Sequence, residues 1–200
     1  MSRIVLATRN AAKLTELARI LAEAGLPLQV CGVADFPDVP EVAETGTTFA
    51  ENALLKARAV AAATGVPAVA DDSGLCVDAL NGMPGIFSAR WAGKHGDDEA
   101  NLDLVLGQLV DVPDDRRGAH FACAAALALP DGTGATVLAT ITGELLRERH
   151  GSNGFGYDPI FRPYGHDRTT AQMSAAEKDA ISHRGQALRA LLPALRRLTG

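Results

Sequence analysis

Cysteine is scarce in this sequence. Three of its 200 residues are cysteines, Cys31, Cys76 and Cys123, and no two of them form a C-x-x-C pair. We therefore expect no disulfide framework and no cysteine-based zinc site, and reduced, buried thiols of this kind are typical of a cytoplasmic protein. The N-terminal residues lack the basic region and the long apolar stretch of a signal peptide, so we expect none.

Positive charge and long apolar runs are also lacking. The 19 Lys and Arg residues are outnumbered by 24 Asp and Glu residues, which gives a net charge of −5. Proteins that bind nucleic acid or a membrane surface generally need a basic face, so we expect neither partner. The longest apolar stretch, HFACAAALALP (120–130), is too short to span a bilayer. A small anionic ligand is still compatible with this composition, because a few local cations can bind it.

Apolar residues are plentiful, at 47% of the chain, and charged residues make up 22%. This balance is typical of a globular protein with a full core. A chain of this length fits one domain, or one domain with two lobes, and we expect residues 1–200 to form a single domain.

The N-terminal third alternates between strand and helix patterns. Five successive segments carry these patterns: 3–8, 14–25, 28–33, 48–64 and 67–70. The first, third and fifth are strand-like, whereas the second and fourth have helical spacing. The order β-α-β-α-β favours an α/β fold built on a sheet.

The middle of the chain is less regular. Residues 80–93 are rich in glycine and predict a loop, and residues 97–110 predict an amphipathic helix. Two strand-like runs, 119–130 and 134–146, flank the hairpin signal DGTG.

The C-terminal part predicts helices. Ser174 and Glu177 have the spacing of a capping box, and leucines from Leu188 to Leu195 form an apolar stripe. Pro193 lies inside this stripe, so we expect it to kink the helix or to shift its start.

The segment TRNAAK (8–13) lies between a predicted strand and a predicted helix. Backbone N–H groups at a helix N-terminus favour anions, so this turn could bind a phosphate. Thr8 and Asn10 would add side-chain donors, and Lys13 would add a positive charge. The alternative is an ordinary strand-to-helix turn, and the segment matches neither the Walker pattern nor G-x-G-x-x-G.

The segment ETGTTFAENALLKA (44–57) places polar residues in a helix rich in Ala and Leu. Asn52 and Lys56 are four residues apart and share a face, although by itself this pattern favours a solvated face. Glu44, in the preceding loop, could reach a metal ion, and Glu41 is a less favoured candidate.

Asp71 and Asp72 follow an apolar run and are expected at its carboxyl end, where α/β sheets bind ligands. Two adjacent carboxylates there need a cation, and Mg²⁺ prefers oxygen ligands. Since successive strand residues face opposite sides, one aspartate can address a metal or a water while backbone donors hold the other. The alternative is an Asx-turn with a helix cap.

Two later segments are rich in glycine or in positive charge. GSNGFGYDPIF (151–161) predicts a loop whose backbone approaches a flat ligand and whose rings stack on it, or else a hairpin turn. SAAEKDAISHRG (174–185) brings Lys178, His183 and Arg184 to a helix end, although His183 alone would more often be a surface or capping residue. Six further basic residues are expected to be solvated: Lys94, His95, Arg116, Arg117, Arg196 and Arg197.

Scattered cations, paired carboxylates and a glycine-aromatic loop are what a metal-dependent nucleoside triphosphate enzyme needs. The chain resembles the inosine triphosphate pyrophosphatase family in five stretches that occur in the family's order and span nearly the whole sequence: LATRNAAKLTEL, ETGTTFAENALLKA, ADDSGLCVDALNGMPGIFSARWAG, GSNGFGYDPIF and TTAQMSAAEKDAISHRGQAL. The resemblance implies an elongated, two-lobed α/β fold around a central twisted mixed sheet with a nucleotide-binding cleft, and usually a homodimer. It also implies Mg²⁺-dependent hydrolysis of ITP, dITP, XTP and dXTP to the monophosphate and pyrophosphate.

The resemblance further implies roles for particular residues. Asp72 looks like the general base and a metal ligand, Glu44 like a metal ligand, and Asp71 like a supporting group. The triphosphate site would comprise Thr8, Arg9, Asn10, Ala11, Ala12, Lys13 and Lys56. The nucleotide and base site would comprise Ser73, Phe155, Gly156, Tyr157, Asp158, Lys178, His183 and Arg184. Some relatives carry two glutamates before the TG dipeptide, whereas the first position here is Ala43, so metal ligation must rest on Glu44.

Two other functions remain open. A Maf-like nucleotide pyrophosphatase would act on pyrimidine or modified nucleotides and would hydrolyse dTTP or UTP. A nucleotide-binding sensor or assembly protein would bind without releasing pyrophosphate, although pure binding needs no general base such as Asp72.

Overall fold

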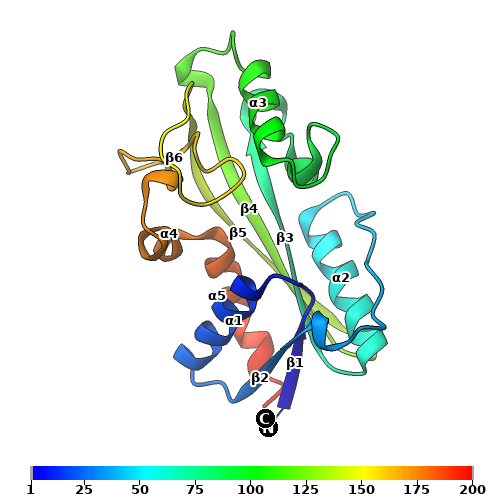
Figure 1. Cartoon of the computed structure of the whole chain (residues 1–200). Coiled ribbons are helices and arrows are strands. Elements are labelled where there is room, and N and C mark those ends of the chain that lie inside the picture. The colour runs from blue at the N-terminus through cyan, green and yellow to red at the C-terminus, as the bar shows by residue number, and fades with distance from the viewer. Residues whose placement is uncertain (1, 200) are drawn as a thin grey trace. The chain divides into compact units, whose positions relative to one another are not determined.

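The computed structural model describes residues 2–199, and its six strands form one sheet in the order β2-β1-β3-β4-β5-β6 (Figure 1). The strands are β1 (Ser2–Leu6), β2 (Leu28–Gly32), β3 (Ala68–Val77), β4 (Gly118–Ala128), β5 (Gly134–Leu145) and β6 (Phe161–Pro163). β1 runs parallel to β2 and β3, whereas β6 is antiparallel to β5. The sheet is therefore mixed, and the predicted α/β fold is confirmed.

Residues 2–199 form five α-helices. They are α1 (Ala11–Glu23), α2 (Phe49–Thr64), α3 (Asp98–Gln108), α4 (Ala175–Ile181) and α5 (His183–Arg196). Residues that favour helix ends bound α2 and begin α4. Thr48 caps α2 by accepting a hydrogen bond from the Glu51 N–H, and Gly65 ends this helix with a left-handed φ of 67°. The predicted capping box of Ser174 and Glu177 opens α4.

The chain divides into two compact units, which agrees with the prediction of two lobes. Among the described residues, unit 1 comprises 2–72, 123–139 and 184–199, and unit 2 comprises 73–122 and 140–183. Strands β3, β4 and β5 each contribute residues to both units.

In unit 1, helices cover both faces of the sheet, with α1 and α5 on one face and α2 on the other (Figure 1). The side chains of β1 alternate between the two cores. Ile4 and Leu6 pack with α1 and α5, whereas Val5 packs with α2. Unit 2 has its own core, in which Leu102 of α3 and Phe161 of β6 are fully buried.

Two sequence predictions about local structure are wrong, and one of the two alternatives for Pro193 is excluded. β3 does not end at the two aspartates but continues to Val77, because Leu75 and Val77 are fully buried in the core of unit 2. Of the two effects expected for Pro193, the structure excludes a shifted start, since α5 begins at His183 and runs through Pro193. Arg117 is not a solvated residue: it is 3% exposed, and its guanidinium donates to the carbonyl groups of three residues: Leu109, Leu145 and Leu146.

Candidate active site

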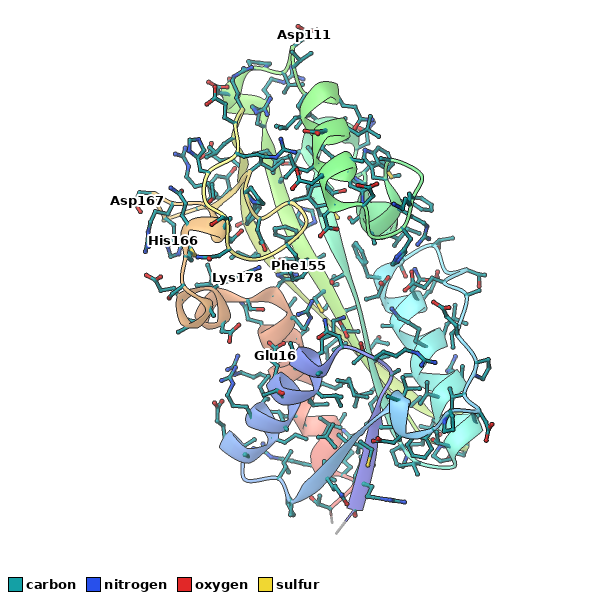
Figure 2. The ribbon with its side chains drawn as sticks, in the orientation of Figure 1. Glu16, Asp111, Phe155, His166, Asp167 and Lys178 are labelled. Carbon is teal, nitrogen blue, oxygen red and sulfur yellow. The ribbon has the colours of Figure 1, made fainter. Side chains whose placement is uncertain are left out.

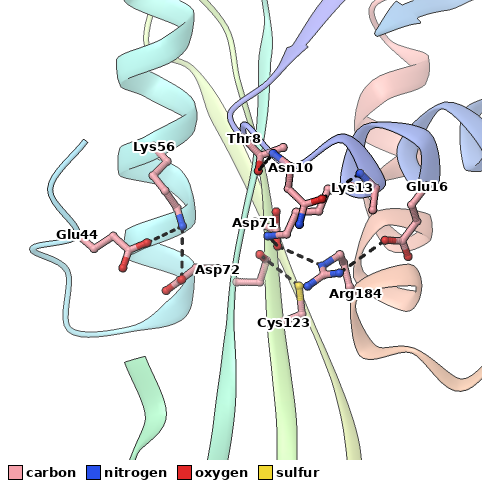
Figure 3. Close-up of polar contacts among 12 residues, drawn as sticks. Thr8, Asn10, Lys13, Glu16, Glu44, Lys56, Asp71, Asp72, Cys123 and Arg184 are labelled. Atoms are coloured by element: carbon pink, nitrogen blue, oxygen red, sulfur yellow. Dashed lines mark hydrogen bonds and ion pairs between the residues drawn. The ribbon is translucent and has the colours of Figure 1, made fainter. Parts of the chain in front are cut away.

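Asp71 and Asp72 are consecutive residues of β3, and their side chains leave the strand on opposite faces (Figure 3). The pleat of the strand explains this. Asp71 lies two residues after Val69 and shares its face, and Val69 packs in the core beneath α1 and α5. Asp72 lies two residues after Ala70 and shares its face, and Ala70 packs beneath α2. Each carboxylate therefore meets a different helix and a different set of cations.

Asp72 lies in a polar cluster on the α2 face. Lys56 Nζ is 3.4 Å from Asp72 Oδ1 and 2.8 Å from Glu44 Oε1, so one ammonium group bridges two carboxylates. Asn52 Nδ2 donates to Asp72 Oδ2 at 3.2 Å. The predicted metal ligands, Asp72 and Glu44, are thus brought together with the predicted phosphate contact Lys56.

Asn52 is the residue that ties this cluster to the backbone. It is fully buried in α2, and its Oδ1 accepts a hydrogen bond of 2.8 Å from the Gly46 N–H. The amide therefore holds the loop that carries Glu44 with one end and Asp72 with the other. A Cβ at position 46 would overlap Asn52, so only glycine allows this close approach.

The environment of Asp72 disfavours its charged form. Burial raises the pKa of Asp72, and the nearby charge of Glu44 raises it further; Lys56 and the Asn52 hydrogen bond lower it, and the net shift is upward. Burial lowers the pKa of Lys56, but the charges of Asp72 and Glu44 outweigh this effect and raise it, so Lys56 stays protonated. A raised pKa makes the Asp72 carboxylate a stronger base than an ordinary aspartate.

Asp71 lies in a second cluster, on the face of α1 and α5 (Figure 3). Its Oδ2 is 2.6 Å from Lys13 Nζ and 3.3 Å from Arg184 Nε. Arg184 NH1 also lies 3.8 Å from Oε2 of Glu16. Burial alone would raise the pKa of Asp71, but Lys13 and Arg184 outweigh it and lower the pKa, so this carboxylate stays ionised.

The TRNAAK turn begins α1, as expected, but its polar side chains are used differently. Asn10 is the N-cap, and its Oδ1 accepts from the Ala12 N–H at 2.9 Å. Thr8 Oγ1 accepts from the Asn10 N–H at 3.2 Å. Both side-chain oxygens thus satisfy backbone groups of the turn, while Ala11 and Lys13 belong to the first turn of the helix.

A cavity of about 360 Å³ lies beside the Lys56–Glu44 pair in unit 1. Polar side chains from three parts of the chain line it: Thr8, Arg9, Glu41, Glu44 and Lys56. The two glutamates considered for the metal site therefore border the same hollow, together with the predicted phosphate contacts Thr8 and Arg9.

Unit 2 holds the other predicted substrate contacts. Asp158 is buried and accepts hydrogen bonds from the Phe155 N–H at 2.9 Å, from Thr170 Oγ1 at 2.8 Å, and from Lys178 Nζ. The Lys178 ammonium lies 5.0 Å from the centre of the Phe155 ring, which is 65% exposed (Figure 2). Asp158 thus shapes the loop that presents Phe155 and Lys178. Contact of these residues with a nucleotide stays a prediction.

The remaining predicted contacts in unit 2 have structural partners. The buried Tyr157 donates through its hydroxyl to the Ser88 carbonyl group at 2.9 Å, and the Gly156 N–H donates to Asp98 at 3.0 Å. The ring of His183 stacks on Phe121, with centroids 5.2 Å apart and an angle of 8°. Ser73 is a partly exposed residue of β3. Binding of substrate by these residues stays a prediction.

Comparison with known proteins identifies the family of this chain. A sequence profile of the Ham1 family matches residues 4–194. The chain belongs to the Ham1 family. A relative from Streptomyces coelicolor named dITP/XTP pyrophosphatase is 64% identical over 200 residues, which cover 100% of both chains. A protein of the same name from Nocardia farcinica is 60% identical over 98% of this chain and 95% of its own length.

Solved structures of Ham1 proteins have the same fold. The HAM1 protein from Coxiella burnetii superposes with a TM-score of 0.91 at 45% identity, covering 98% of this chain and 100% of that one. These matches do not support the Maf-like alternative.

The donor set around Asp72 fits a divalent cation. Oxygens of Asp72 and Glu44 already converge on one positive charge, at Lys56 Nζ. Mg²⁺ in proteins takes one or two carboxylates and completes its shell with water and substrate phosphates. Residues 2–199 contain no group of three or more His, Cys, Asp or Glu side chains arranged for a metal ion, so the candidate site is a pair of carboxylates.

The sequence pattern does not single out three residues that contact the predicted site residues. The helical pattern around Asn52 favours a solvated face, but Asn52 is buried beside Asp72, and its spacing of four residues from Lys56 is the one signal for this position. Glu16 and Phe121 gave no signal, because an acidic residue in a helix and an aromatic residue in a strand are common. Only the tertiary structure places them against Arg184 and His183.

Proposed function

We propose that this protein hydrolyses non-standard purine nucleoside triphosphates, namely ITP, dITP, XTP and dXTP, to the nucleoside monophosphate and pyrophosphate. The observation that carries the proposal is the cluster of Asp72, Lys56 and Glu44 in a Ham1 family chain. Relatives that match its full length bear the name dITP/XTP pyrophosphatase.

Asp72 is the proposed general base. Its carboxylate accepts a proton from a water molecule whose oxygen attacks the α-phosphorus. The bond between the α-phosphorus and the bridging oxygen breaks, and pyrophosphate leaves with that oxygen. The raised pKa of Asp72 brings it closer to neutral pH, and Asn52 holds the carboxylate in one orientation.

Lys13 and Lys56 are the proposed contacts of the β- and γ-phosphates, together with the turn from Thr8 to Lys13. Their positive charges would offset the negative charge that develops on the leaving pyrophosphate. Both lysines already contact carboxylates in unit 1, which holds their ammonium groups in place before substrate binds.

Asp72 and Glu44 are the residues that would hold Mg²⁺. When bound, the ion would withdraw negative charge from the phosphate oxygens and orient them for in-line displacement. The carboxylates themselves supply the hard oxygen ligands that this ion prefers.

Arg184 and His183 are proposed to select the base. Hypoxanthine and xanthine carry a 6-oxo acceptor where adenine carries a 6-amino donor. A site of hydrogen-bond donors binds the oxo group and leaves its donors unpaired against adenine, and such sites can discriminate by about 10⁴. Their replacement, for example His183→Ala, should therefore lower the ratio of ITP to ATP hydrolysis.

We also propose that the protein is a cytoplasmic homodimer. Three free cysteines are compatible with a reducing compartment. Among residues 2–199, no helix is both long and apolar enough to cross a membrane. Light scattering on the purified protein would measure its mass against the 20.8 kDa of one chain.

The proposal is tested by measuring pyrophosphate and orthophosphate release from ITP, XTP, dITP, GTP, ATP, dTTP and UTP, with Mg²⁺ and with a chelator. We expect Mg²⁺-dependent pyrophosphate release that is confined to ITP, dITP and XTP. Turnover of dTTP or UTP would favour the Maf-like activity, and nucleotide binding without any release would favour a sensor.

A further inference from the structure

Lys13 of α1 and Arg184 of α5 meet at a single atom. Oδ2 of Asp71 lies 2.6 Å from Lys13 Nζ and 3.3 Å from Arg184 Nε. Asp71 is 7% exposed, so water contributes little to its solvation. Two cations from different helices therefore depend on the same buried oxygen.

The charges of this cluster are balanced. Glu16 contacts Arg184 from the other side, with Oε2 at 3.8 Å from NH1. Lys13 and Arg184 together offset Asp71 and Glu16. A buried carboxylate is stable only while its cations stay in place, so a change at one partner of Asp71 must alter its hold on the other.

We propose that Asp71 is a positioning residue that couples the phosphate end of the substrate site to the base end. The inference rests on the proposed function, which assigns Lys13 to the phosphates and Arg184 to the base. When a phosphate attracts Lys13, Oδ2 of Asp71 loses one donor and binds Arg184 more strongly. Arg184 is then held more firmly and loses less freedom on binding the base.

Two small probes separate the ends of the substrate. Pyrophosphate carries phosphates without a base, and inosine carries the base and ribose without phosphate. Calorimetric titration of inosine into the full-length protein, with and without saturating pyrophosphate and Mg²⁺, measures the coupling. We expect pyrophosphate to tighten inosine binding about five-fold, and inosine to tighten pyrophosphate binding by the same factor.

Two variants test the role of Asp71. In Asp71→Asn the side chain keeps its shape but loses its charge, and each probe should bind with an affinity that no longer depends on the other. In Lys13→Met the shared oxygen serves Arg184 alone. The affinity of this variant for inosine, measured without pyrophosphate, should therefore equal the affinity of the wild type measured with saturating pyrophosphate. This gain would come from a residue that is not itself assigned to the base.

Glu23→Gln is the matched control. Glu23 also links the two helices, with Oε1 at 2.8 Å from Arg19 of α1 and Oε2 at 3.7 Å from Arg189 of α5, but it is exposed. Its removal should leave the coupling unchanged.

Independent binding of the two probes to the wild type, or coupling that persists in Asp71→Asn, would overturn the inference even if ITP is hydrolysed. If instead the wild type neither hydrolyses ITP nor binds either probe, the proposed function itself fails and the inference fails with it.

Discussion

Asp71 and Asp72 are neighbours in sequence but have separate cations: Lys13 lies 2.6 Å from Asp71, and Lys56 lies 3.4 Å from Asp72. Their pKa values shift in opposite directions, downward for Asp71 and upward for Asp72. When the pKa values of two neighbouring acidic groups shift in opposite directions, one group stays ionised and the other can exchange a proton. This difference supports the proposal that Asp72 is the base and that Asp71 is a fixed charge.

Replacement of Asp72 by Asn should remove catalysis without unfolding the protein. The amide cannot accept a proton from water, so pyrophosphate release from saturating ITP should fall about 10²- to 10⁴-fold. Thermal unfolding should change little, because Lys56 keeps its contact with Glu44. Asp103→Asn, at an exposed residue paired with Arg149, serves as a control and should retain wild-type turnover. Near-normal turnover in the Asp72 variant would contradict its assignment.

Asn52→Leu should affect both stability and turnover. The Gly46 N–H would lose its acceptor and Asp72 would lose an orienting donor, at a cost of about 1–3 kcal/mol in the free energy of unfolding. We expect the turnover number to fall roughly ten-fold, because the base is less well oriented. Urea unfolding and steady-state rates measure the two effects. Arg58→Ala, on the exposed side of the same helix, should change stability by no more than about 0.5 kcal/mol.

Gly74 and Gly107 form a matched pair for substitution by alanine. At position 74 a Cβ would overlap the Gly85 carbonyl oxygen and the Ser88 hydroxyl group, so Gly74→Ala should destabilise by about 1–3 kcal/mol. At position 107, on the exposed side of α3, nothing lies within 4 Å of the added atom. Gly107→Ala should stabilise by about 0.5–1 kcal/mol. Equal unfolding midpoints for the two variants would refute this account.

Arg116 and Arg117 are adjacent but should respond very differently to replacement by methionine. Arg117→Met removes three hydrogen bonds to backbone carbonyl groups inside unit 2, and the loss should reach about 3 kcal/mol or more. Arg116 is exposed, so Arg116→Met should be close to neutral. Chemical denaturation of both variants compares the two directly, and a small effect at position 117 would show that its carbonyl partners find other donors.

Cys123 should make stability fall at alkaline pH. Burial raises the pKa of its thiol from 9.0 to about 12, and the charge of Asp71 adds to the shift. Above pH 9 the unfolded chain loses this proton while the folded chain keeps it, so unfolding becomes easier by up to about 1.4 kcal/mol per pH unit.

Cys123→Ala should lack this contribution. The free energy of unfolding, measured at pH 7.5 and at pH 10.5, should decline less in the variant than in the wild type. The difference in the free energy of unfolding between the two proteins at pH 7.5 measures the packing lost in the variant, and only the further change at pH 10.5 reports on the thiol. Parallel declines in both proteins would argue against a protonated thiol in the folded state.

The fold could be predicted largely because its signals are local. Apolar spacing indicated β1, α1, β2 and α2, and a turn sequence indicated the β4–β5 hairpin. The length of β3 could not be predicted, because two adjacent aspartates normally end a buried strand. Here Lys13 and Lys56, which are distant in sequence, neutralise them on the two faces of the sheet.

The candidate site was predictable only in part. The motif residues Lys56, Glu44 and Asp72 lie in contact, and the roles that the resemblance implies for them stay predictions. The burial of Asn52 and Arg117 depends on segments that are distant in sequence, and a single polar residue has the same local pattern whether it faces water or a core.

The pairing of β3 with β1 determines on which face of the sheet each of the two aspartates lies. The strands align Val5 with Ala68 and Leu6 with Val69. A slip of one residue would exchange the faces of Asp71 and Asp72, so that the proposed base would face Arg184 and the fixed charge would face Lys56. The same slip would turn Val69 out of its core. Burial of the apolar residues of β3 therefore fixes the face on which each aspartate lies, and with it the proposed role of each. Insertions or deletions just before Asp71 should be far more damaging than substitutions there.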